Sequence, residues 1–218
     1  MEMPAERVAR SLLKVKAVFC NLEHPFTFTS GTVSPVYVDM RKVISYPGPR
    51  TEIAELSASC IKSRVGLEKV DVIAGGETAG IPYAAWVADR LNLPMIYVRK
   101  QAKGFGRNAM VEGDVQPGQR VVLVEDLVFN GQSKVKFAEG IRNTGALCEH
   151  VLAVFDYAYT GESAAILDVA GIQLHTLTNW PVLLKVAGDE GFFSPLEIET
   201  IQEFLANPRA WSQKRGGV

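Results

Sequence analysis

The chain has 218 residues, of which 47% are hydrophobic and 22% are charged, so it can bury a core and is not intrinsically disordered. Its formal net charge of -1 gives no reason to expect a nucleic-acid or membrane partner, so any anion site must be local. Its three cysteines are odd in number and lack zinc-like spacing, which predicts reduced thiols in a cytoplasmic protein.

The N-terminal quarter is predicted to hold two helices separated by an irregular segment. Its first residues, MEMPAERVAR, do not have the apolar run of a signal peptide, and no later stretch is apolar enough to span a bilayer. Apolar residues recur at helical spacing from Val8 to Val15 and again from Ile53 to Cys60. Residues 21–49 between them are rich in Thr, Ser, Gly and Pro, and a long segment of this kind is often functional.

Strands and helices alternate from residue 70 onward. The apolar runs VDVIAGG, PMIYVRK, QRVVLVEDL, EHVLAVFDY and GIQLHTLTN read as strands, and GIPYAAWVADRL and SKVKFAEGIRNTG read as helices. This order predicts an α/β fold with a mostly parallel sheet and helices on both faces. Ligands of such sheets bind beyond the carboxyl ends of the strands, which nominates residues 75–80, 99–106, 125–133 and 156–157.

The two ends of the chain are expected to form a small cap beside the sheet. A last helix is predicted to begin near Ser194, where a hydroxyl residue precedes a proline. We therefore expect a single domain over residues 1–218. Its core spans about 66–180, and its cap is made from about 1–48 and 181–218.

The segment VVLVEDLVFNGQSK, residues 121–134, is the strongest candidate for chemistry. Its apolar strand ends in two carboxylates, Glu125 and Asp126, within reach of a sugar diol. A short loop with Gly131 follows, and the helix that begins near Ser133 offers unpaired N–H groups to a phosphate. The alternative is that the two acids only solvate a strand end and cap a helix.

Four cations follow the second predicted strand, in YVRKQAKGFGRNAMVEG, residues 97–113. Arg99, Lys100, Lys103 and Arg107 on one glycine-containing loop suit a polyanion such as pyrophosphate. The alternative is an ordinary solvated basic loop.

Two further segments contain groups that suit anionic ligands. FTFTSGTVSPVYVDMR, residues 26–41, ends in Arg41, a natural bidentate partner for a ligand carboxylate, although an ordinary surface ion pair is the alternative. GGETAGIP, residues 75–82, is a strand-to-helix turn whose backbone amides suit pyrophosphate, but a lone glycine-rich turn is weak support.

Taken together, these segments resemble the orotate phosphoribosyltransferases, a branch of the type I phosphoribosyltransferases. The acidic segment is similar to the signature that binds phosphoribosyl pyrophosphate (PRPP). The order Arg-Lys-x-x-Lys-x-x-Gly resembles the mobile catalytic loop of the orotate branch, and SG-x-x-SP-x-Y-x-D-x-R resembles its N-terminal pyrimidine segment. The resemblance runs from about Leu12 to Pro208.

Several positions depart from the pattern of the family, among them Asn130 and Gln132 in the phosphate loop, and Thr29 and Ala79, where some members have a lysine. Phe105 stands where the family usually has a histidine, Phe129 where it has a small hydroxyl residue, and Tyr157 where several members have an arginine that contacts orotate. The last change makes Arg41 the favoured partner for the orotate carboxylate.

The resemblance implies a type I phosphoribosyltransferase fold and transfer of ribose 5-phosphate from PRPP to orotate, giving orotidine 5'-monophosphate and pyrophosphate. It implies catalytic roles for Lys103, Glu125 and Asp126. The implied PRPP-binding residues are Thr78, Ala79, Arg99, Lys100, Lys103, Arg107, Glu125, Asp126, Leu127, Val128, Phe129, Asn130, Gly131, Gln132 and Ser133. The implied orotate-binding residues are Ser30, Gly31, Tyr37, Asp39, Arg41, Phe129 and Tyr157.

The resemblance further implies that Mg²⁺ is held by PRPP and water, with no direct protein ligand. It implies a homodimer in which the loop of residues 100–110 acts in the partner's site. Two other functions stay open at this point. One is a phosphoribosyltransferase for another base, and the other is a non-catalytic regulator that binds PRPP.

Overall fold

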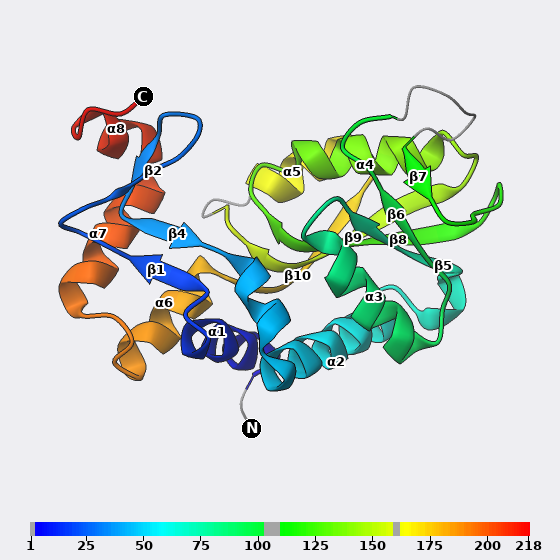
Figure 1. Ribbon diagram of the computed structural model, residues 1–218, viewed down its shortest axis with the longest axis horizontal. Helices are drawn as coiled ribbons and strands as arrows, with labels where there is room; N and C mark the ends of the chain where they lie inside the picture. Colours follow the sequence, from blue (N-terminus) through cyan, green and yellow to red (C-terminus); the bar gives the residue numbers. More distant parts are fainter. Residues whose placement is uncertain (1–2, 103–109, 159–161) are drawn as a thin grey trace.

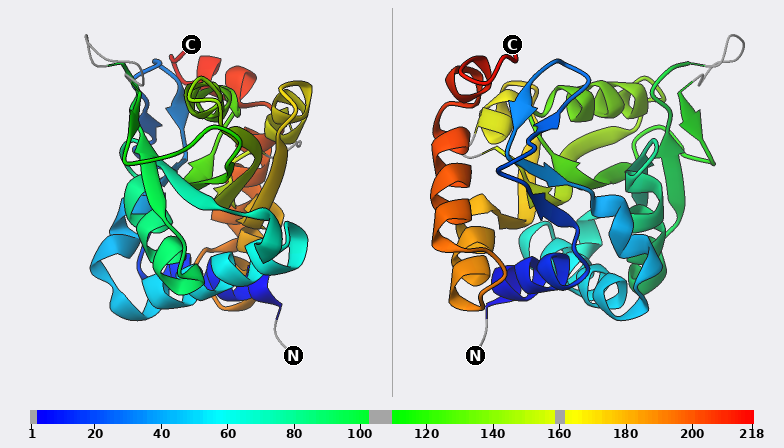
Figure 2. Two further views of the ribbon diagram at one scale, coloured as in Figure 1. Left: turned by 90° about the vertical axis from the view of Figure 1, so that its right-hand side faces the viewer. Right: turned by 60° about the vertical axis from the view of Figure 1, so that its left-hand side comes forward.

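The computed structural model describes residues 3–102, 110–158 and 162–218, and they form a large α/β core with a smaller hood beside it (Figure 1). Both ends of the described chain contribute to the hood, so segments far apart in sequence meet there (Figure 2). The expected mostly parallel sheet with helices on both faces is confirmed.

In the described residues the core sheet has six strands, in the order β10-β9-β8-β5-β6-β7. All neighbouring strands are parallel except β6 and β7, which pair antiparallel. The bounds are β5 Val72–Gly76, β6 Met95–Val98, β7 Val111–Glu112, β8 Arg120–Val128, β9 Leu147–Asp156 and β10 Gln173–Asn179. The two-residue strand β7 was not predicted, and it brings the chain back to the sheet edge after the basic loop.

Alternate residues of the central strands face two separate apolar layers. Val122 and Val124 of β8 belong to one layer, and Val121 and Leu123 belong to the other. Because both faces are covered, the parallel strands read as continuous apolar runs. Figure 1 shows α4 (Gln132–Arg142) and α5 (Glu162–Val169) along one face, with α1 (Pro4–Lys14), α2 (Pro47–Arg64) and α3 (Gly80–Leu91) along the other.

The helices around the core begin where the sequence offers starting residues. Their bounds are α1 Pro4–Lys14, α2 Pro47–Arg64, α3 Gly80–Leu91, α4 Gln132–Arg142 and α5 Glu162–Val169, with the 3₁₀ helices η1 Met40–Ser45 and η2 Leu67–Lys69. Proline in the first turn opens α1 and α2, because its missing N–H would be unpaired there in any case. Helix α1, which the sequence places in the cap, packs both on α6 (Trp180–Asp189) of the hood and on β10 and α2 of the core.

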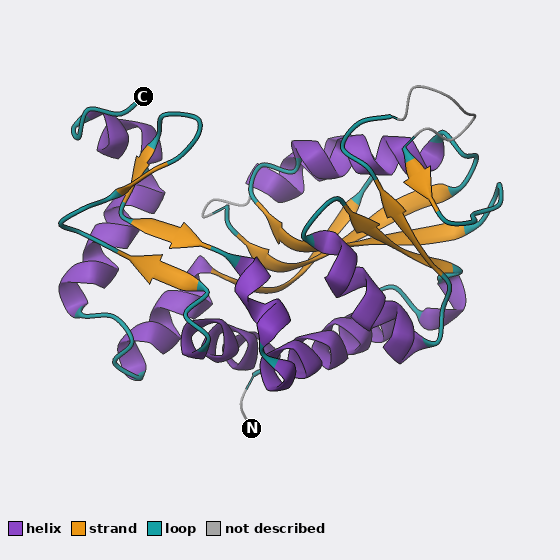
Figure 3. Cartoon of the chain, viewed as in Figure 1, coloured by secondary structure: helices purple, strands orange, loops and turns teal. Residues whose placement is uncertain are grey.

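The hood combines short strands from the N-terminal part with helices from the C-terminal part (Figure 3). Its elements are β1 Val18–Cys20, β2 Phe26–Thr27, β3 Val33–Ser34, β4 Val36–Val38, α6 Trp180–Asp189, α7 Pro195–Ala206 and α8 Pro208–Gln213. Antiparallel pairs join β1 to β4 and β2 to β3. The backbone N–H of Val33 donates to Ser212 Oγ at 2.8 Å, which fastens α8 to the hairpin.

Candidate active site

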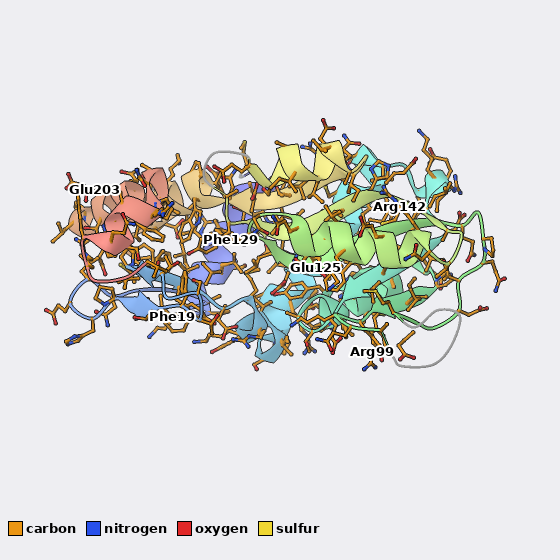
Figure 4. All side chains as sticks on the ribbon, turned by 90° about the horizontal axis from the view of Figure 1, so that it is seen from above. Phe19, Arg99, Glu125, Phe129, Arg142 and Glu203 are labelled. Carbon is orange, nitrogen blue, oxygen red and sulfur yellow. The ribbon has the colours of Figure 1, made fainter. Side chains whose placement is uncertain are left out.

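A cleft of about 580 Å³ opens at the carboxyl ends of β5 and β8, where α3 and α4 begin; we call it the strand-end cleft. It is lined by Tyr37, Val38, Asp39, Met40, Arg41, Glu77, Thr78, Ala79, Lys100, Glu125, Asp126, Leu127, Ser133, Lys134, Lys136 and Phe137. Its position agrees with the rule that parallel sheets bind ligands at these ends. Seen from above, Glu125 lies near the middle of the molecule, with Phe129 toward the hood and Arg99 toward the opposite end (Figure 4).

Glu125 is the inner of the two predicted acids, and only 3% of it is exposed. Its Oε2 lies 2.7 Å from Nζ of Lys134, a buried lysine in the first turn of α4. Burial raises the pKa of the Glu125 carboxyl, and the charge of Lys134 opposes that rise. The pair fixes the end of β8 against the start of α4.

Asp126 is the outer acid, partly exposed on the wall of the strand-end cleft. Burial raises its pKa as well. The charges of Lys134 and Arg41 and the backbone N–H groups of residues 126 and 127 favour its ionised form. It is therefore an acceptor that faces the cleft near two cations.

The loop after β8 brings the start of α4 to the same region, where the N–H of Gln132 donates to Asn130 Oδ1 at 3.2 Å and the N–H of Lys134 donates to the Gly131 carbonyl at 2.9 Å. Gly131 adopts a φ of +76°, a left-handed conformation that L side chains avoid, and it is the N-cap residue of α4. The first turn of α4 therefore presents N–H groups at the positive end of the helix dipole. Such a terminus suits the dianionic end of a sugar phosphate.

Arg41 and Tyr37 form the wall on the hood side. Arg41 Nε donates to Asp39 Oδ1 at 2.6 Å, and Arg41 Nη2 donates to the Tyr37 hydroxyl at 3.3 Å. The preceding residue, Met40, is fixed because its carbonyl accepts a 2.8 Å hydrogen bond from Tyr83, whose side chain is buried in α3. The Arg41 side chain is 62% exposed, so its charge stays available to a ligand.

A second, mainly apolar space of about 1630 Å³ lies between the hood and the core; we call it the hood cavity. It shares Tyr37, Val38 and Leu127 with the strand-end cleft, so the two spaces adjoin. Within it, the rings of Phe129 and Tyr157 lie 5.0 Å apart, and Phe129 is 56% exposed. A flat, apolar ring system fits such a surface.

The predicted site residues fall into four groups. Those lining the strand-end cleft are Tyr37, Asp39, Arg41, Thr78, Ala79, Lys100, Glu125, Asp126, Leu127 and Ser133. Those lining the hood cavity are Ser30, Tyr37, Leu127, Phe129, Asn130 and Tyr157. Predicted residues that line neither space are Gly31, Arg99, Val128, Gly131 and Gln132. Lys103 and Arg107, with Phe105 between them, lie outside the described residues.

The basic strand end reaches the cleft in part. Lys100 lines the strand-end cleft, and its backbone N–H donates to Glu77 Oε2 at 2.8 Å. Arg99 instead turns to the sheet edge, where its Nη1 lies 3.4 Å from Glu112 Oε1. Lys100 therefore lines the strand-end cleft, whereas Arg99 does not.

Sequence reasoning missed Lys134, although a signal for it was present. Lys134, Ala138 and Ile141 share one face of the predicted helix, and that face is otherwise apolar. A lysine on a buried face needs an acid nearby, since an unpaired charge is costly to bury. The acid pair that ends the preceding strand was its natural partner.

The described residues contain neither a metal-binding cluster nor a membrane-spanning helix. No group of three or more His, Cys, Asp or Glu side chains there is arranged to hold a metal ion. No helix in that part of the chain has the length and apolar character needed to cross a membrane.

Comparisons with known proteins point in one direction. The family model described as phosphoribosyl transferase domain matches residues 47–170. Orotate phosphoribosyltransferase from Agrobacterium fabrum is 46% identical over 98% of this chain and 92% of its own length, and that from Cereibacter sphaeroides is 46% identical over 97% and 91%. Among solved structures, orotate phosphoribosyltransferase from Aeropyrum pernix is 30% identical, with a TM-score of 0.72 over 86% of this chain and 99% of that one. Leishmania donovani UMP synthase is 26% identical, with a TM-score of 0.79 over 93% of this chain and 42% of that one.

Proposed function

The chain belongs to the orotate phosphoribosyltransferase family, and from this we infer that it transfers ribose 5-phosphate from PRPP to orotate. The products are orotidine 5'-monophosphate and pyrophosphate, a step of pyrimidine biosynthesis. The single observation that carries this function is that the strand-end cleft adjoins the aromatic hood cavity along Tyr37, Val38 and Leu127. One space suits a charged sugar phosphate, and the other suits a planar base.

The ribose is proposed to bind at the end of β8. Asp126 accepts hydrogen bonds from the ribose hydroxyls, and Glu125 adds negative charge behind it. Displacement at the anomeric carbon develops positive charge on the sugar, which these acids stabilise. The N–H groups at the start of α4 receive the 5'-phosphate.

The pyrophosphate is proposed to lie at the opposite side of the strand-end cleft. Thr78, Ala79 and Lys100 line that side, and the backbone amides of the first two and the ammonium group of Lys100 are the proposed contacts. Neutralising the leaving group lowers the barrier to its departure. Lys103 and Arg107 are proposed to add charge there, although both lie outside the described residues.

Orotate is proposed to bind where the two spaces meet. Tyr37 lines both, and the ring pair Phe129 and Tyr157 forms the apolar wall beyond it. Arg41 is the proposed partner of the orotate carboxylate, because its guanidinium group is held beside Tyr37 and remains exposed.

Mg²⁺ is proposed to enter with PRPP. The described carboxylates of the cleft fit this arrangement, because Glu125 already has Lys134 as a partner and Asp126 is free to accept from metal-bound water. The ion would neutralise charge on the pyrophosphate group. A homodimer in the cytoplasm, with the loop of residues 100–110 acting in the partner's site, completes the proposal.

A panel of bases tests the assignment. Orotate, uracil, adenine and hypoxanthine are each mixed with the enzyme, PRPP and Mg²⁺, and turnover is followed by the absorbance change of each base. Orotate is expected to react fastest. Faster turnover of another base would overturn the choice of substrate, and PRPP binding without turnover of any base would indicate a regulator.

A further inference from the structure

Lys134 is buried in an unusual place for a lysine. It lies in the first turn of α4 with its side chain 10% exposed, and its Nζ is 2.7 Å from Glu125 Oε2. The Glu125 side chain is 4% exposed, so the pair is almost fully removed from solvent. Burying two charges is costly, and the cost is offset only when their geometry is good.

The second oxygen of Glu125 sits in a cradle made by two glycines. A Cβ at Gly76, the last residue of β5, would collide with Glu125 Oε1, and a Cβ at Gly80 would lie 2.5 Å from the same oxygen. The carboxylate therefore needs both positions to lack a side chain. One acid thus contacts the end of β5, the start of α3 and the start of α4.

Building on the proposed function, we propose that Lys134 is a positioning residue for phosphoribosyl transfer that acts through Glu125. The ion pair holds the first turn of α4 against the end of β8. That contact sets where the N–H groups of α4 and the carboxylate of Asp126 stand relative to each other. A ligand that spans sugar and phosphate requires both at once.

The charges around the pair give the proposal a measurable signature. The other titratable groups that line the cleft with Glu125 and Lys134 are Asp126 from β8, Glu77 after β5, Tyr37 from β4, Asp39 and Arg41 at the start of η1, Lys100 after β6 and Lys136 from α4. Gly76 and Gly80, from β5 and α3, add no charge. Lys134 is the cation in direct contact with Glu125. Without it, the pKa of the Glu125 carboxyl is expected to rise further, because the charge that opposes the effect of burial is lost.

A direct role for Lys134 is the competing explanation, because Lys134 also lines the cleft. The two roles differ in a double-mutant cycle. If Lys134 acts through Glu125, then Lys134→Met costs little once Glu125→Gln has been made. If its ammonium group contacts PRPP, the two losses add.

The experiment compares Lys134→Met, Lys134→Arg, Glu125→Gln and the double variant Lys134→Met/Glu125→Gln, in the full chain. Lys185→Met on the exposed surface of α6 is the control for the substitution itself. The readouts are kcat/KM for PRPP from pH 6 to 9, and PRPP affinity by titration calorimetry. Lys134→Met is expected to lower kcat/KM for PRPP at pH 7 by about tenfold or more. The kcat/KM of this variant is expected to rise towards the wild-type value as the pH rises and Glu125 ionises. Lys134→Arg is expected to lower kcat/KM by a smaller factor, because it keeps a positive charge beside Glu125.

The double variant is expected to match Glu125→Gln within about twofold. Additive losses, or a Lys134→Met pH profile parallel to that of wild type, would overturn the proposal. If Lys134→Met does not fold, the arginine and double variants still give the comparison, because neither leaves a lone buried charge. If wild type binds PRPP but turns over no base, the proposed function fails. The double-mutant cycle measured on PRPP affinity would then still test whether Lys134 acts through Glu125.

Discussion

Glu125 and Asp126 are neighbours in sequence but have different surroundings. The inner carboxylate is enclosed by Lys134 and two glycines, and the outer one faces the strand-end cleft. Successive side chains of a strand point to opposite faces of the sheet, so two adjacent acids can have different partners and different roles. We expect the outer acid to dominate the chemistry.

Asp126→Asn is expected to lower turnover by about 100-fold or more, because charge that balances the sugar in the transition state is lost. Stability is not expected to fall. Burial raises the pKa of Asp126 in the folded state. The protonated carboxyl therefore stabilises the folded protein at low pH, and this stabilisation is lost as the pH rises through the folded-state pKa. At neutral pH the amide therefore removes an unfavourable charge. Steady-state kinetics with a thermal melt checks both parts, and either unfolding or near-normal turnover would make this acid structural.

Arg41→Ala is expected to raise KM for orotate more than KM for PRPP. The guanidinium group is held by Asp39 and Tyr37 and offers a charge-assisted hydrogen bond to a carboxylate, worth roughly 1.5–3 kcal/mol. KM for orotate should therefore rise about tenfold or more. Arg90→Ala on the surface of α3 is the matched control. Equal increases for both substrates would contradict the assignment.

At the residue scale, the sequence was informative where chemistry depends on residue type. The acids of β8 and Arg41 could be nominated because each lies at a strand end or in a motif, and the structure brings them to one cleft. The turn of Arg99 toward Glu112 could not be foreseen, because β7 was not predicted. Pairing across a sheet edge has no local signature in the sequence.

At the scale of elements, long periodic segments were predictable and very short strands were not. The central strands β5, β8 and β9 appear as apolar runs because both of their faces are largely buried. Strands β1 to β4 have two or three residues each, too few to show alternation. Helix α6, which begins at Trp180, follows β10 directly, so its start is marked by the capping side chain of Asn179 and by Pro181 in its first turn.

One ion pair joins the starts of two central strands. Asp71 accepts hydrogen bonds from the backbone N–H of Arg120 at 2.7 Å and from Arg120 Nε at 2.9 Å. These bonds lower the pKa of Asp71 to about 2. A lowered pKa means that the stabilisation is present above the unfolded-state pKa of about 3.9 and is lost as pH falls through about 2.

Asp71→Asn is therefore expected to unfold at a lower temperature than wild type at pH 7, with the gap closing between about pH 4 and pH 2. The effect is modest because both side chains are partly exposed and solvent screens them. Asp89→Asn, in a surface pair with Arg90, is the matched control and should show a smaller gap. A gap that stays constant across this pH range would show that the charge of Asp71 is not the cause.

At the scale of the whole molecule, the site depends on how the hood meets the core. The hood cavity is lined by residues of the β2–β3 hairpin, of α7 and α8, and of the loop after β8 (Figure 1). The sequence predicts a cap from the two chain ends, but its orientation depends on contacts between them, such as that of Val33 with Ser212. Long-range packing of this kind is not encoded in local periodicity.

The last prediction concerns two copies of the chain. If the enzyme is a homodimer and Lys103 acts in the partner's site, a Lys103→Ala chain and an Asp126→Asn chain should complement each other. In a mixed dimer one site carries both lesions and the other carries neither. Random exchange makes half of the dimers mixed, so activity should rise to about a quarter of wild type, well above either parent. Subunit exchange is followed with a tagged chain, and molecular mass is measured by sedimentation at assay concentration. Exchange without a gain in activity would show that Lys103 serves its own subunit or is not catalytic, and a monomer would exclude action between subunits.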